Sequence, residues 1–215
     1  MNLNLIKAYT KRILQTDVSG HDFYHCQRVA VSAQKLWQQD FSTATYNDEI
    51  DAASYLHDTI DEKIVNDPQK ALSQIRTLLT TVGFNASQQK DIISTITQMS
   101  FSKNIAQQQQ LPLFGQYVQD ADRLDALGAI GIARAFAYGG SHQQPIYDPH
   151  LQPEKLSNHF QYRHHQTTTI NHFYEKLLHL QNLMNTKAGK KLAQQRSQYM
   201  QQFLTEFQQE WDGQK

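Results

Sequence analysis

The sequence lacks the features that mark secreted or membrane-spanning proteins. Cys26 is its single cysteine, which excludes an internal disulfide and is typical of a protein in a reducing compartment. No apolar stretch approaches the roughly 20 residues that a membrane span needs. Residues 1–14 also lack the continuous apolar segment of a signal peptide. We therefore predict a cytoplasmic protein with no membrane partner.

Charge of neither sign is in excess, because 20 Lys and Arg balance 20 Asp and Glu in 215 residues. This balance provides no general positive field, and we predict that nucleic acid is not a partner. A small phosphorylated ligand would instead depend on local positive charge. The length suffices for one sizeable core, and we predict a monomer or a homodimer.

Strand patterns are missing as well, since nearly every segment has a helical period. Helices are predicted over about residues 4–14, 21–38, 48–57, 68–82 and 92–99, and one long helix is predicted to end near residue 138. Pro145, Pro149 and Pro153 exclude regular helix from the next segment. We predict an all-α single domain over residues 1–215, with a helical core up to about residue 138. A C-terminal extension over about 139–215 is predicted to form a helical hairpin.

Two imidazoles and two carboxylates fall on the apolar sides of predicted helices, where Leu, Ile or Val would be usual. Burying such groups without partners is costly, and convergence on one divalent cation would explain them. The four residues are His25, His57, Asp58 and Asp122. Cys26 points about 100° away from His25 around its helix, so we predict that it packs in the core.

This set of nitrogen and oxygen donors suits a borderline or moderately hard divalent ion. The pattern contains no thiolate, which argues against a structural zinc site. Four protein ligands on an octahedral ion leave two positions for water and substrate, as a catalytic metal requires. We predict one ion per chain, with Mn²⁺ favoured and Mg²⁺, Fe²⁺, Co²⁺, Ni²⁺ or Zn²⁺ as alternatives.

The order His, His-Asp, Asp resembles the signature of the HD-domain metal-dependent phosphohydrolase superfamily. The matching segments are His25-Cys-Gln-Arg-Val29, Leu56-His-Asp-Thr-Ile-Asp61 and Val118-Gln-Asp-Ala-Asp-Arg-Leu-Asp-Ala126. Residues 172–178 and 184–187 are similar to a bacterial subfamily of small, stand-alone HD hydrolases. The resemblance implies that the metal ligands are His25, His57, Asp58 and Asp122.

Some members of that subfamily look like nucleoside-triphosphate pyrophosphohydrolases. The resemblance therefore implies cleavage of a nucleoside triphosphate, ribo or deoxy, to the monophosphate and pyrophosphate by a metal-activated water. An alarmone-type pyrophosphohydrolase and a 5′-nucleotidase are alternatives, because the same core serves many chemistries. A non-catalytic nucleotide-binding HD module is a third alternative, which the intact ligand set disfavours. The Gly-Tyr-Pro motif of the cyclic-dinucleotide branch is absent.

Asp61 and Glu62 occupy the place where the alarmone-hydrolysing branch, which this segment resembles, carries an acidic pair that activates water. If the helix continues beyond Asp58, the Asp61 carboxylate lies one turn further and can accept a proton. The alternative for both residues, and especially for Glu62, is a solvated helix end.

Substrate phosphates need cations, and Arg28 is favoured because it follows His25 by three residues on the same side of the helix. His21 could reach the rim of the site, or could instead pair locally with Asp22. Further candidates, for each of which a surface charge is the default interpretation, are Lys63, Lys176 and Lys187. Asp125, one turn from Asp122, is left open between an ion-pairing role and a functional one.

Overall fold

The computed structural model describes residues 1–15, 20–45, 47–62, 64–104, 107–154 and 166–215, and all regular structure within these ranges is helical. This confirms the all-α prediction. The α-helices are α1 (Asn4–Ile13), α2 (Phe23–Phe41), α3 (Asp48–Leu56), α4 (Pro68–Val82), α5 (Ala86–Gln98), α6 (Leu113–Asp125), α7 (Gly128–Ser141), α9 (Thr169–Glu175) and α10 (Lys187–Trp211). Three 3₁₀ segments accompany them, η1 (His57–Ile60), η2 (Phe101–Asn104) and η3 (Leu177–Leu183). None of these described helices combines the length and apolar character needed to cross a bilayer.

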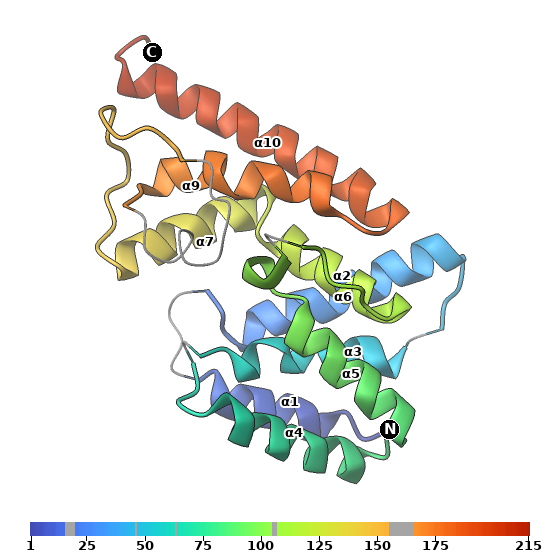
Figure 1. Ribbon diagram of the computed structural model, residues 1–215. Helices are drawn as coiled ribbons and strands as arrows, with labels where there is room; N and C mark the ends of the chain where they lie inside the picture. The colour runs from blue at the N-terminus through green and yellow to red at the C-terminus, as the bar shows by residue number, and fades with distance from the viewer. Residues whose placement is uncertain (16–19, 46, 63, 105–106, 155–165) are drawn as a thin grey trace.

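The helix α3 lies at the centre of the bundle and contacts α1, α2, α5 and α6. On the outside of this group, α1 and α4 lie side by side, whereas α7, α9 and α10 cover the opposite end (Figure 1). The helix α10 packs against α7, α6 and α2. The C-terminal part of the chain therefore rests on the helices that carry the predicted ligands.

Side-chain caps start α2 and α3, the two helices that lead into His25 and His57. Asp22 accepts a hydrogen bond of 2.8 Å from the backbone N–H of His25, which places His25 in the first turn of α2. Asn47 caps α3 by accepting from the N–H groups of Glu49 and Ile50. Local sequence therefore determines where these two helices begin.

The prediction of one long helix ending near residue 138 was wrong. The helix α6 ends at Asp125, and Leu127 is extended at φ −118° and ψ 159°. The helix α7 then starts at Gly128, which has a left-handed φ of +70°. A Cβ on Gly131 would overlap the backbone carbonyl of Ala126. Gly128 and Gly131 thus permit a sharp corner between α6 and α7. A residue with a side chain at either position would force this corner open.

The C-terminal arm is less regular than the sequence predicted. The short α9 gives way to the 3₁₀ segment η3 before the chain turns into α10. Asp120, which is fully buried, accepts bonds of 2.8–3.1 Å from the backbone and side chains of Asn185 and Thr186 at that turn. This carboxylate anchors the start of α10 to α6.

Candidate metal centre

His25 presents one ring nitrogen to the interior of the bundle. Its side chain is completely buried, and its Nδ1 lies 2.7 Å from Oδ2 of Asp125. An ionised carboxylate accepts from Nδ1–H, which assigns the proton to Nδ1 and leaves the lone pair of Nε2 available. Asp125 therefore sets both the tautomer and the ring orientation of His25.

His57 is oriented in the same sense by a different group. The helix α3 ends at Leu56, and His57 opens the 3₁₀ segment η1. Its Nδ1 donates to the backbone carbonyl of Ser54 at 2.8 Å, which leaves Nε2 as the free donor atom. The two Nε2 atoms of His25 and His57 lie 3.3 Å apart.

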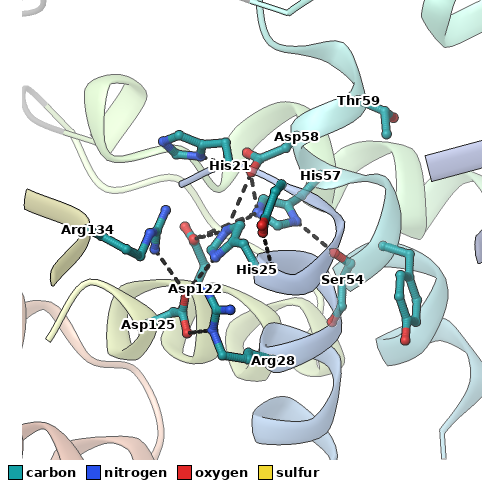
Figure 2. A network of polar contacts seen from close by, with 12 residues as sticks. His21, His25, Arg28, Ser54, His57, Asp58, Thr59, Asp122, Asp125 and Arg134 are labelled. Atoms are coloured by element: carbon teal, nitrogen blue, oxygen red, sulfur yellow. Dashed lines mark hydrogen bonds and ion pairs between the residues drawn. The ribbon is translucent and has the colours of Figure 1, made fainter. Parts of the chain in front are cut away.

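The carboxylates of Asp58 and Asp122 converge on these two nitrogens from η1 and α6 (Figure 2). His25 Nε2 lies 3.4 Å from Asp58 Oδ2 and 3.3 Å from Asp122 Oδ1. His57 Nε2 lies 3.3 Å from Asp58 Oδ1 and 3.7 Å from Asp122 Oδ1. We call these four side chains the cage.

The dimensions and donor chemistry of the cage fit one divalent ion. For bonds of about 2.0–2.2 Å to nitrogen and oxygen, neighbouring donor atoms around an ion lie about 3–3.5 Å apart. The observed separations of 3.3–3.7 Å between the histidine nitrogens and the neighbouring donor atoms are close to this range. The groups come from three separate elements, so local sequence alone does not bring them together.

The electrostatics of the cage favour a cation. Burial raises the pKa of Asp122, but the hydrogen bond from His25 and the charge of His57 outweigh burial and lower that pKa to about 2. The pKa of Asp58 is likewise lowered well below its usual value, because His57, His21 and His25 outweigh burial. Burial lowers the pKa of His25, yet its bonds to Asp122 and Asp125 prevail and raise it to about 9. A divalent ion would replace the proton that His25 then carries.

Asp125 is the centre of a second cluster beside the cage. Arg28 donates to it twice, from Nε at 2.8 Å and from Nη2 at 3.0 Å. Arg134 of α7 donates from Nη1 at 3.0 Å (Figure 2). These bonds, together with the contact to His25, resolve the open question about Asp125, which lies in a network that supports the cage.

The cage opens toward His21 and Asp122. His21 places Nδ1 3.0 Å from Asp58 Oδ2, and its side chain is 39% exposed. The side chain of Asp122 is 28% exposed, against 12% for Asp58 and 4% for His57. His21 thus lies at the rim, which is one of the two alternatives that the sequence left open, and this side is where solvent reaches the cage.

Cys26 also lies near cage atoms, and its sulfur could be grouped with His57 and Asp58 as a possible ligand. The thiol is completely buried. Burial, reinforced by the negative charges of Asp58 and Asp122, raises its pKa well above the usual value. A protonated thiol is a poor ligand, so Cys26 serves as the core residue that the sequence predicted.

The backbone of the predicted acidic pair, Asp61 and Glu62, does not continue the helix as expected. The 3₁₀ segment ends at Ile60, and Asp61 is extended at φ −69° and ψ 131°. The expectation that a continuing helix carries Asp61 one turn beyond Asp58 was wrong, although the Asp61 N–H still bonds to the Asp58 carbonyl at 3.1 Å. Asp61 is half-buried and Glu62 is exposed.

The predicted lysines lie at varied places. Lys176 follows α9, with Nζ 5.1 Å from the centroid of the Phe101 ring. Lys187 is the exposed first residue of α10. Lys63 lies outside the described residues. Arg134, which the sequence analysis missed, lies nearer the cage through its bond to Asp125.

Solved structures of similar proteins show the family to which the chain belongs, although no family model matches it. A solved structure from Lactobacillus plantarum is 43% identical, with a TM-score of 0.85, over 98% of this chain and 97% of that one. An HD-superfamily hydrolase from Bacillus thuringiensis is 37% identical, with a TM-score of 0.74, over 98% of this chain and 96% of that one. The chain therefore belongs to the HD superfamily of hydrolases and is a metal-dependent phosphohydrolase, as its motifs indicated.

YpgQ of Bacillus subtilis is a further relative, 31% identical over 209 residues that cover 97% of this chain and 93% of YpgQ. Its solved structure in complex with ADP matches with a TM-score of 0.76 over 97% of each chain. That relative therefore binds a nucleotide.

The support that Asp125 gives to His25 leads to a first test. In Asp125→Asn, the amide offers one acceptor oxygen where His25 and two guanidinium groups now donate. We expect divalent-metal affinity to fall about 10- to 100-fold, as is typical when a ligand histidine loses its orienting carboxylate. Calorimetric titration of chelator-stripped protein with Mn²⁺ measures the change. Asp212→Asn, at the exposed end of α10, is the matched control. Equal affinities in the two variants would show that Asp125 does not orient a ligand.

Proposed function

We propose that this phosphohydrolase holds one divalent ion through the cage and uses it to hydrolyse nucleotides. The observation that carries the proposal is the convergence of the two Nε2 atoms, 3.3 Å apart, with two carboxylates whose oxygens lie 3.3–3.7 Å from those nitrogens. The proposed ligands are His25, His57, Asp58 and Asp122. Mn²⁺ is the ion that we favour, because a mixed nitrogen and oxygen set suits an ion of intermediate hardness.

The substrate that we propose is a nucleoside triphosphate, ribo or deoxy, cleaved to the monophosphate and pyrophosphate. The ADP complex of YpgQ supports a nucleotide ligand, and the C-terminal motifs support this subfamily. In the reaction, the oxygen of water bonds to the α-phosphorus, and the bond from that phosphorus to the bridging oxygen breaks. Pyrophosphate leaves, and the water gives up its proton. We propose that the reaction takes place in the cytoplasm, consistent with the single cysteine.

The bound ion would supply Lewis acidity, which activates water and polarises a phosphoryl oxygen. The chain would supply the remaining functions. Asp61 is proposed to accept the proton of the attacking water, because its backbone is bonded to that of Asp58 next to the cage. Glu62 is the alternative acceptor. His21, at the rim beside Asp58, is proposed to steady the substrate.

Phosphate contacts are also proposed for Arg28, Lys63, Lys176 and Lys187. Arg28 is already paired with Asp125 through Nε and Nη2, so only the rest of its guanidinium can serve a substrate. Its side chain is 37% exposed, which leaves it accessible from solvent.

The direct test is a panel of nucleotides with chelator-stripped protein and separate additions of Mn²⁺, Mg²⁺, Co²⁺ and Ni²⁺. We expect pyrophosphate and a nucleoside monophosphate as products, with the highest rate in Mn²⁺. The Asp58→Ala variant should lose metal and activity together, because the ion is left short of charge and ligands. Release of inorganic phosphate would indicate a 5′-nucleotidase instead, and cleavage confined to alarmones would indicate that branch. Binding without turnover would indicate a non-catalytic module.

The Asp61→Asn variant separates chemistry from metal binding. Asparagine keeps the shape of the side chain but cannot take up a proton near neutral pH. We expect normal Mn²⁺ content, a KM within a few-fold of wild type and a kcat lower by about 10²- to 10⁴-fold. Glu62→Gln is the companion variant. If Asp61→Asn turns over normally and Glu62→Gln does not, the base is Glu62. Loss of metal from Asp61→Asn would make Asp61 a ligand.

A further inference from the structure

The corner between α6 and α7 brings Arg134 to the cage. Arg134 and Asp125 are nine residues apart, yet Nη1 and Oδ2 lie at 3.0 Å. In one continuous helix these residues would be about 13.5 Å apart along the axis and on opposite faces. The ion pair exists because Gly128 and Gly131 allow the chain to fold back.

The guanidinium of Arg134 is only partly used by the described part of the protein. Nη1 donates to Asp125, but the Nε–H, which is buried, has no hydrogen-bond partner among the described residues. Buried donors of a charged group are rarely left without an acceptor, and such a group calls for an explanation. Arg28, in contrast, meets Asp125 with two nitrogens.

Gly20, in the backbone that leads into α2, packs closely against this guanidinium. Residue 20 is a glycine with φ +92°, and a Cβ there would lie 3.2 Å from Arg134 Nε and 3.3 Å from its Cγ. A larger residue would press on the side chain. Gly20 comes just before His21, so Arg134 lies near the rim through which solvent reaches the cage (Figure 2).

The local charge also favours an anion at this place. Two guanidinium groups, those of Arg28 and Arg134, share the single carboxylate of Asp125. The two carboxylates of the cage would be balanced by a divalent ion. One positive charge is therefore in excess beside the proposed metal, and a phosphate oxygen is the group that a planar guanidinium binds best.

We propose that Arg134 is a substrate-binding residue that holds a phosphate group of the nucleotide next to the metal. This assignment rests on the proposed function. The Asp125 bond holds the guanidinium in place, and its other N–H groups, with its positive charge, can serve a phosphate oxygen. Because the Arg134 charge would bind phosphate and not the base or sugar, removing it should lower the affinity for phosphorylated ligands alone.

The test uses Arg134→Gln and Arg134→Lys in the full-length, manganese-loaded protein, with Arg76→Gln on the exposed face of α4 as the control. Affinities for Mn²⁺, ADP and adenosine are measured by calorimetry. We expect Arg134→Gln to weaken ADP binding about 10- to 100-fold, the range for a charge-assisted hydrogen bond, and to change Mn²⁺ affinity by less than about 3-fold. Adenosine binding should not change. The ADP affinity of Arg134→Lys should lie between those of wild type and Arg134→Gln, because lysine retains the charge but lacks the planar guanidinium that binds phosphate through two nitrogens.

Two results would overturn the assignment. If Arg134→Gln binds ADP as wild type does, no phosphate contact exists. If Mn²⁺ and ADP affinities fall together and Arg134→Lys restores both, Arg134 only steadies Asp125.

Inorganic tripolyphosphate separates this inference from the proposed function. Binding of tripolyphosphate that depends on Arg134, in a wild-type protein that hydrolyses no nucleotide, would retain the phosphate site and reject the function. Nucleotide hydrolysis that is insensitive to Arg134 would do the reverse.

Discussion

Asp58 and Asp122 bring two negative charges into a largely enclosed space, and the rest of the site depends on positive charge between them. Both carboxylates have lowered pKa values, and His25 has a raised one, because these groups lie against one another. Apolar side chains at the same positions would be easier to bury. The arrangement is understandable if a divalent ion offsets the repulsion. Because the chain belongs to the HD superfamily of hydrolases, such an ion would take part in hydrolysis.

A support network around the cage determines which atoms face the ion. Asp125 and the Ser54 carbonyl hold the Nδ1 protons of the two histidines, so that both Nε2 atoms point inward. The C-terminal extension reinforces the α6–α7 corner on which Asp125 and Arg134 meet. Arg196 of α10 donates to the Leu124 carbonyl at the end of α6, and Asp120 fixes the start of α10. The extension thereby supports the helix that carries Asp122 and Asp125 without contributing one of the four proposed ligands.

Helix spacing, together with the order of the HD motifs, predicted the polar groups that meet in the cage, because a buried imidazole or carboxylate is conspicuous on an apolar helix face. It failed where backbone geometry changes over two or three residues. Gly128 and Gly131 are residues that indicate a corner in the sequence. Without that corner, Arg134 was expected far from Asp125, and its role was not predicted. Residues 57–60, in contrast, contain no glycine or proline to announce a 3₁₀ turn. The role of Asp125 stayed open because its partners His25 and Arg28 lie in another helix, about 100 residues earlier in the chain.

The most direct measurement of the central claim is a crystal structure of the chain grown with Mn²⁺, with anomalous diffraction recorded on both sides of the manganese absorption edge. We expect one strong anomalous peak per chain, with His25 Nε2, His57 Nε2 and carboxylate oxygens of Asp58 and Asp122 at about 2.0–2.3 Å. A peak bound by other residues, or no peak between these four side chains, would contradict the metal centre and the hydrolytic function built on it.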